Sequence, residues 1–310
     1  MRVRVLGAAA GGGFPQWNAN SEACRRARAG DPAARPATQA SIAVSADGVR
    51  WVLLNASPDL RQQIEATPEL HPCQGLRSSP IEAVVLTNGD VDAVAGLLHL
   101  REGTPFVLLA HERVHAALDA NPLFNVLNRE VVQRRHLRPG SWQALSDAAG
   151  ADLGVSVRPF VAPGKVPLYL EGQTDRLDTA AFTGDALGLE IAPTGREAPR
   201  LVYLANCARL DDGVIEKIAD ADLLFMDGTL WRDDEMIRQG VGCKTGARMG
   251  HVSMSGPDGV LARLSGVPVG RRVFIHVNNT NPALLADSPE RAELEAEGWQ
   301  VAFDGMELSL

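Results

Sequence analysis

The sequence predicts an α/β fold in which two β-sheets are flanked by helices, a four-layer αββα sandwich. Two observations lead to this prediction. Segments with strand character come first, an alternation of strands and helices follows, and this succession occurs twice along the chain. The later strands include largely apolar runs, such as residues 81–86 and 223–226, which are typical of strands buried on both faces. We expect one domain over residues 1–310, a length that can bury a sizeable core.

The N-terminal region has the pattern of antiparallel strands. Residues 2–6 alternate between apolar and polar side chains. Residues 39–45 and 50–55 are expected to pair as a β-hairpin around a short turn. Ser57 is expected to cap the helix that begins directly after it, because its hydroxyl can accept a backbone N–H group of the first helical turn.

The remaining elements are predicted from apolar periodicity and turn residues. Strands are expected at residues 106–109, 155–161, 187–192, 200–204, 273–277, 300–303 and 306–308. Helices are expected at residues 92–101, near 112–120, at 214–219 and at 290–297. Residues 121–150 are polar and have helical character.

Composition excludes several classes of function. The formal net charge of -8 argues against a nucleic-acid surface, which needs a basic stripe. The chain contains no apolar segment of the roughly 20 residues that a membrane-spanning helix needs, and it enters a strand pattern at once without a signal-peptide architecture. We therefore expect a cytoplasmic protein without a membrane partner. The four cysteines form no Cys-x-x-Cys pair and are expected to be free thiols.

Polar side chains of metal-binding type follow several buried strands. They are Asn88, Asp90 and Asp92 after residues 81–86, Asn206 after 200–204, Asp227 after 222–226, and His276 near the end of 273–277. A carboxylate at the end of an apolar run is costly unless it is paired or bound to a metal. Each residue alone is better explained as a helix or turn cap, but the set together favours a metal site.

Two further segments could contribute to this site. His251 lies between glycines and serines, which indicates a loop that opens a helix with Ser253 or Ser255 as its cap. Its imidazole could be a metal ligand or a general acid or base, because its pKa lies near neutrality. The polar loop that follows His276 could line a substrate pocket through Asn278, Asn279 and Asn281.

Six segments carry a resemblance that covers the whole chain. They are residues 5–18, 55–59, 163–169, 227–231, 244–256 and 274–282. With them the chain resembles the metallo-β-lactamase superfamily and, within it, the branch that serves the biosynthesis of the coenzyme pyrroloquinoline quinone (PQQ). The resemblance favours the four-layer sandwich over a doubly wound parallel sheet.

The superfamily carries a metal-binding box, His-x-His-x-Asp-His, at a position that here holds Asn88, Asp90, Asp92 and Ala93. The three imidazoles of the box are absent, which argues against the usual dinuclear zinc hydrolase site. The remaining set comprises Asp90, Asp92, Asp227, His251 and His276, with Asn88 and Asn206 as weak ligands or supports of the ligands. Two histidines and carboxylates with open positions suit non-haem Fe(II), and Zn²⁺ is the alternative.

The resemblance implies hydroxylation of the tyrosine ring in a PQQ precursor derived from Glu-Tyr, with Asp92 and His251 as the catalytic candidates. Alternatives are a carrier that moves PQQ or its precursor towards the periplasm, and a mononuclear zinc hydrolase. The partners it implies are the peptide-derived precursor and other PQQ biosynthesis proteins, and homodimer formation stays open.

One further segment departs from the relatives that the chain resembles. Many of them carry a Cys-x-Cys-x-x-Cys motif, which resembles a structural zinc site, where this chain has Ala19, Ser21 and Cys24. Because structural zinc needs several soft ligands, we expect no structural zinc here.

Overall fold

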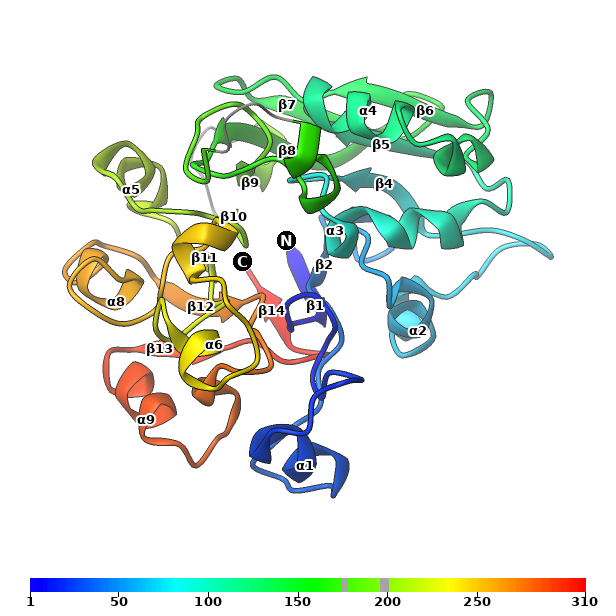
Figure 1. Cartoon of the computed structure of the whole chain (residues 1–310). Coiled ribbons are helices and arrows are strands. Elements are labelled where there is room, and N and C mark those ends of the chain that lie inside the picture. Colours follow the sequence, from blue (N-terminus) through cyan, green and yellow to red (C-terminus); the bar gives the residue numbers. More distant parts are fainter. Residues whose placement is uncertain (174–177, 196–200) are drawn as a thin grey trace.

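Two sheets packed face to face form the centre of the molecule in the computed structural model, which describes residues 1–173, 178–195 and 201–310 (Figure 1). The first sheet has the strand order β14-β1-β2-β3-β4-β5-β6. Its strands are β1 (Arg2–Gly7), β2 (Ser41–Ser45), β3 (Trp51–Leu54), β4 (Ile81–Val85), β5 (Phe106–Ala110), β6 (Val132–His136) and β14 (Glu307–Ser309).

The second sheet has the order β13-β12-β11-β10-β9-β8-β7. Its strands are β7 (Gln143–Ser146), β8 (Asp152–Val161), β9 (Leu187–Pro193), β10 (Leu201–Leu204), β11 (Leu223–Asp227), β12 (Arg271–Ile275) and β13 (Trp299–Val301).

The two sheets are built in the same way. In each, antiparallel pairs come first, and three parallel pairs follow: β3-β4, β4-β5 and β5-β6 in one, and β10-β11, β11-β12 and β12-β13 in the other. The last strand, β14, returns to pair with β1, with Val3 opposite Leu308. This arrangement explains why strands and then a strand–helix alternation occur twice along the sequence, since parallel neighbours need a crossover connection.

Alternation along the strands divides the apolar side chains among three interfaces. Val52 and Leu54 of β3 face the second sheet, whereas Leu53 faces the helices outside the first sheet. In β11, Phe225 joins the core between the sheets and Leu224 packs toward the outer helices of the second sheet. Because successive side chains of a strand point to opposite faces, three cores separate four layers. The predicted four-layer αββα sandwich is confirmed.

Helices cover the outer faces of both sheets (Figure 1). The α-helices of the N-terminal half are α1 (Glu22–Arg28), α2 (Leu60–Glu65), α3 (Val91–Val94) and α4 (Glu112–Asp119). Those of the C-terminal half are α5 (Asp212–Ile218), α6 (Glu235–Arg238), α7 (Gly246–Met249), α8 (Val260–Arg263) and α9 (Pro289–Ala296). The 3-10 turns are η1 (Pro68–Leu70), η2 (Ala95–Leu100), η3 (Pro122–Val126), η4 (Leu168–Gln173) and η5 (Pro282–Leu284). No helix in the described part of the chain is long and apolar enough to cross a bilayer.

Several local predictions are wrong. Residues 121–150 contain the two edge strands β6 and β7 and only one short 3-10 turn, because sheet pairing at an edge outweighs a polar, helix-like composition. The expected helix at 92–101 splits into α3 and η2. Ser57 does not cap α2: its hydroxyl donates to Gln63 Oε1 at 3.0 Å, and Asp59 stands at the N-cap without a side-chain cap hydrogen bond.

Candidate metal site and pocket

The polar residues that follow the parallel strands meet at one edge of the sandwich. Asp227 ends β11, His276 directly follows β12, and Asn206 follows β10, all from the second sheet. Asp90 and Asp92 follow β4 of the first sheet. The carboxyl ends of parallel strands converge at the same edge of a sheet, and loops there commonly carry binding residues. Two sheets therefore contribute to one site.

Asp227 is fully buried, and both oxygens of its carboxylate are engaged. Oδ2 accepts the backbone N–H of Cys207 at 2.9 Å and the Nδ1–H of His251 at 2.7 Å. Oδ1 accepts the backbone N–H and the hydroxyl of Thr229, at 3.0 and 2.7 Å. Burial alone would raise the pKa of Asp227, but the charge and hydrogen bond of His251 and the bond from Thr229 outweigh burial and lower it. Asp227 is therefore an anion held in a fixed position.

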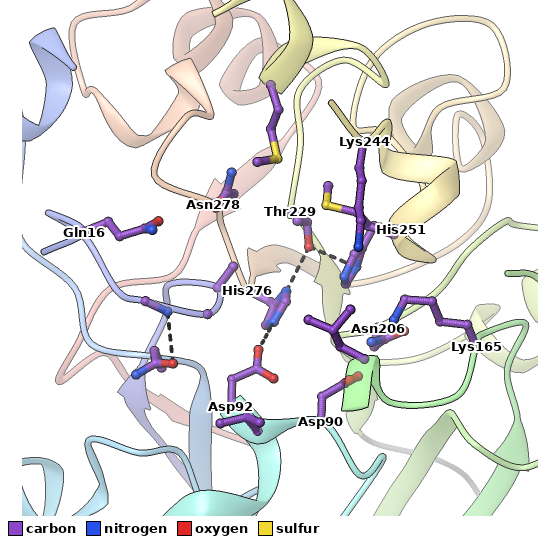
Figure 2. Close-up of a pocket in the computed structure, with 18 of the residues that line it drawn as sticks. Gln16, Asp90, Asp92, Lys165, Asn206, Thr229, Lys244, His251, His276 and Asn278 are labelled. Carbon is purple, nitrogen blue, oxygen red and sulfur yellow. Dashed lines mark hydrogen bonds and ion pairs between the residues drawn. The ribbon is translucent and has the colours of Figure 1, made fainter. Parts of the chain in front are cut away.

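Thr229 joins the two imidazoles of the site. Its hydroxyl oxygen lies 2.8 Å from Nδ1 of His276 and 3.1 Å from Nδ1 of His251. Because the single hydroxyl hydrogen is directed at Asp227, the oxygen accepts from Nδ1 of His276. The two rings stack with centroids 5.2 Å apart. Figure 2 shows both rings on either side of the Thr229 hydroxyl.

His276 is aimed by an unusual backbone conformation. Its φ is 60°, in the left-handed region that non-glycine residues rarely adopt. Nε2 then lies 2.7 Å from Oδ2 of Asp92, across the gap between the two sheets. Burial alone would lower the pKa of His276, but the hydrogen bond and charge of Asp92, with the charges of Asp227 and Asp90, outweigh burial and raise it. The Thr229 oxygen faces Nδ1 and Asp92 Oδ2 faces Nε2, so the geometry favours an imidazolium that donates from both nitrogens.

His251 reaches the site from the end of α7. Gly250 closes this helix in the left-handed conformation, and the N–H of His251 then donates to the carbonyl of Gly246 at 2.9 Å. Its Nε2 makes no hydrogen bond to any described residue. The predicted serine cap is wrong, because Gly259 is the N-cap of α8 and the hydroxyl of Ser255 donates to Trp231 O at 2.7 Å.

The two carboxylates of the first sheet differ. Burial alone would raise the pKa of Asp92, but the hydrogen bond and charge of His276 outweigh burial and lower it. Burial, and then the neighbouring charge of Asp92, raise the pKa of Asp90 to about 6. The Asp90 carboxylate accepts no hydrogen bond from the described residues. Asp90 stands at the N-cap of α3 and lines the pocket, as Figure 2 shows.

The two asparagines expected to support the metal lie in different surroundings. The Asn88 side chain is buried, and its Oδ1 accepts the backbone N–H of Asp90 at 2.9 Å, which is a turn role. Asn206 lines the main pocket together with Asp90 and His276. Both asparagines line a smaller cavity with Asp92 and His276, but only Asn206 also lines the main pocket beside Asp90.

A cavity of about 470 Å³ opens over these side chains. Asn278 is among the residues that line it, whereas Asn279 and Asn281 are not. Asn279 donates to Gln16 Oε1, and buried Asn281 caps η5 and donates to the Gly228 carbonyl at 3.0 Å. Gln16 itself lines the cavity, so the N-terminal loop closes one side of it.

The donor set fits a divalent cation. Asp227, His251 and His276 each offer a ligand atom, and within the described residues these atoms all lie within 4.8 Å of one another. The Asp92 carboxylate joins these three residues through its hydrogen bond with His276. Asp90 adds a second carboxylate, which has no hydrogen bond to the described residues. A cation could replace the proton that His276 and Asp92 share, because ligand imidazoles must give up the proton on the coordinating nitrogen.

Sequence reasoning missed three residues of the site. Thr229 organises both imidazoles, and the available signals were its position two residues after Asp227 and its place in the segment 227–231 that carries the resemblance. Lys165 and Lys244 line the cavity from two of the segments that carry the resemblance, 163–169 and 244–256, but neither lysine was assigned a role. At the positions where many relatives carry the Cys-x-Cys-x-x-Cys motif, Ser21 caps α1 by accepting the N–H of Cys24, and the Cys24 thiol lies 4.0 Å from Asn279 Oδ1. The absence of structural zinc stays a prediction.

Comparison with known proteins extends this description. Residues 50–277 match the family model described as the beta-lactamase superfamily domain. The chain is 53% identical over 305 residues to the coenzyme PQQ synthesis protein B of Gluconacetobacter diazotrophicus, covering 98% of each chain. It is also 53% identical, over the full length of both, to the protein of that name from Methylorubrum extorquens strain PA1. The crystal structure of Zn(2+)-bound PqqB from Methylobacterium extorquens superposes with a TM-score of 0.93, at 51% identity and full coverage of both chains.

Proposed function

We propose a function on the basis of the family of this chain. The chain belongs to the coenzyme PQQ synthesis protein B family, within the metallo-β-lactamase superfamily. From this membership we infer a role in PQQ biosynthesis. The specific step we propose is hydroxylation of the tyrosine ring of a Glu-Tyr-derived precursor by a metal-dependent oxygenase, with Fe(II) as the preferred metal.

One observation carries this proposal: two imidazoles and a buried carboxylate converge beneath an open cavity. Two histidines with carboxylate and free positions form the ligand type of non-haem Fe(II) oxygenases. Asp227, His251, His276 and Asp92 would hold the metal, with Asp90 and Asn206 beside it. Fe(II) would supply the activation of O₂, which inserts one oxygen atom into an aromatic C–H bond. The second oxygen leaves as water with two protons and two electrons from a small-molecule reductant.

The protein's own contribution is orientation and proton handling. Thr229 and Asp227 fix the imidazoles, as second partners of metal-binding histidines commonly do. Asp90, whose pKa of about 6 lies near neutrality, is placed to exchange a proton at the cavity wall. A relative described as Zn(2+)-bound favours a second candidate, a mononuclear zinc hydrolase.

The test is anaerobic reconstitution with Fe(II) or Zn²⁺, followed by ¹⁸O₂, ascorbate and a Glu-Tyr peptide. We expect a product that carries one ¹⁸O atom with Fe(II) alone. His276→Ala is expected to abolish it, whereas His99→Ala, which changes an exposed imidazole outside the pocket, is the matched control. Peptide cleavage with Zn²⁺ and no hydroxylation with Fe(II) would support the hydrolase instead. Binding of PQQ that is indifferent to metal, with neither reaction, would support a carrier.

A further inference from the structure

Lysine is rare in this chain, and its distribution is uneven. Of the 30 basic residues only three are lysines, Lys165, Lys217 and Lys244, so arginine serves at the other 27 positions. Two of the three lysines line the same cavity, above the metal-ligand candidates. The third, Lys217, is exposed on α5. Lysine is a compact point charge on a flexible stem and does not replace the planar guanidinium of arginine without consequence.

The cavity has two regions of opposite character. Asp90, Asp92 and His276 form the floor on one side. Lys165 enters from the loop before η4, and Lys244 from the loop between α6 and α7. In Figure 2 Lys244 lies above His251, and Lys165 lies beside Asn206. A ligand that fills the cavity therefore meets both the metal-ligand candidates and an ammonium group.

The two lysines are not equivalent. The Lys165 ammonium lies 3.0 Å from Oε1 of Glu171, and Oε2 of the same carboxylate accepts from Arg248 at 3.0 Å. These partners lower the pKa of Glu171 to about 2, with the Arg248 hydrogen bond as the largest cause. Lys244, by contrast, makes no ion pair or hydrogen bond with any described residue. It is only partly exposed, and a partly desolvated charge without a partner is unfavourable.

Apolar side chains also line the cavity. Met236, Met249 and Leu168 line the cavity together with Tyr169, whose hydroxyl donates to the Gly89 carbonyl at 2.8 Å and holds η4 beside Asp90. Cavities of a few hundred Å³ with apolar walls and few polar groups bind ring-sized ligands. The walls therefore suit a flat aromatic ring, and Lys244 suits an anion attached to it.

We propose that Lys244 binds a carboxylate of the substrate, so that the cavity selects an aromatic compound that carries a carboxylate. Lys165, held by Glu171, adds positive charge without being the primary contact. The reaction at the ring rests on the proposed function, whereas the carboxylate contact rests on Lys244 alone.

The test uses zinc-loaded full-length protein, in which no oxygen chemistry occurs. Binding of PQQ, a tricarboxylate, and of its uncharged trimethyl ester is measured by fluorescence titration for wild type, Lys244→Met and Lys244→Arg. We expect Lys244→Met to weaken PQQ binding roughly tenfold to hundredfold, because charge-assisted hydrogen bonds are worth that much. Binding of the ester is expected to stay unchanged, and Lys244→Arg to recover part of the loss. Lys217→Met is the matched control.

Equal losses for PQQ and its ester, or no loss for either, would overturn the proposal, and thermal melting of each variant excludes misfolding as the cause. Failure of ring hydroxylation with Fe(II) bears on the proposed function only, because this binding assay contains neither iron nor reductant.

Discussion

The loops that follow β11 and β12 reach the site from the second sheet, and the loop that follows β4 reaches it from the first. The second-sheet side chains form a closed hydrogen-bonded group, in which Asp227 and Thr229 fix both imidazoles. The first-sheet side chains are less constrained. Asp92 touches this group through one contact, and the Asp90 carboxylate accepts no hydrogen bond from the described residues.

This difference suggests that the two sheets have different roles in metal binding. The second sheet provides a preorganised set of ligands whose geometry is fixed before a metal arrives. The first sheet, where the superfamily's imidazole-rich box is replaced, provides negative charge that can adjust to the metal. Substitutions on the two sides of the site distinguish these two roles.

Asp227→Ala should have the largest effect. It removes a fully buried carboxylate and leaves four donor contacts without an acceptor. We expect unfolding free energy to fall by ~3 kcal/mol and metal affinity by at least about 100-fold. Chemical denaturation and a chelator-competition assay measure the two. Asp212→Ala, which changes an exposed carboxylate, is the control. Retained metal affinity would show that the second sheet is not the ligand platform.

Asp92→Asn should weaken metal binding by about 10- to 100-fold with little change in stability, because the amide keeps the shape but loses the charge that faces His276. Asp90→Asn is the comparison within the same loop. It removes the charge that repels Asp92, so we expect less than about a tenfold change in affinity. The reverse order of the two effects, measured by the same competition assay, would exchange their roles.

Metal affinity should depend on pH through His276. The raised pKa of this imidazole means that it keeps its second proton above the ordinary value of 6.5, and metal binding must displace that proton. As pH falls, affinity should therefore begin to decline above 6.5 and drop by about tenfold per pH unit. Calorimetric titration of the protein with metal, from about pH 6 to about pH 9 and in buffers of different ionisation enthalpy, counts the protons released on binding. No proton release would contradict the imidazolium assignment.

Thr229→Val should lower metal affinity by roughly tenfold, because both rings lose the hydroxyl that orients them. Stability should fall by only ~1 kcal/mol. The exposed Thr194→Val is a matched control. If the pH profile of metal binding is unchanged in Thr229→Val, the hydroxyl has no part in holding the proton on Nδ1 of His276.

Asn88→Ala should have the smallest effect on the metal. The Asn88 side chain accepts the N–H of Asp90 in a turn, so we expect a loss of ~1 kcal/mol in stability and less than about a threefold change in affinity. Thermal melting and chelator competition separate the two. A large loss of metal would make Asn88 a ligand, contrary to its contacts.

The sequence alone was informative where a pattern is local. The apolar run of β4 and the alternation in β1 predicted strands, because the side-chain period of a strand can be recognised in a few residues. The edge strands β6 and β7 were missed, because their polar side chains gain strand structure only through a neighbour in the sheet.

For the site, the sequence determined which residue types follow which strands: carboxylates after β4, Asp227 at the end of β11 and His276 after β12. How these side chains meet depends on the folded arrangement of the two sheets. Asp92 and His276 are 184 residues apart in the chain, yet their side chains touch at 2.7 Å. The left-handed backbone of His276, the bridging hydroxyl of Thr229 and the two lysines of the cavity depend on packing between the sheets and on loops from different parts of the chain. Such contacts arise from the register of the folded strands, and no spacing along the sequence encodes them.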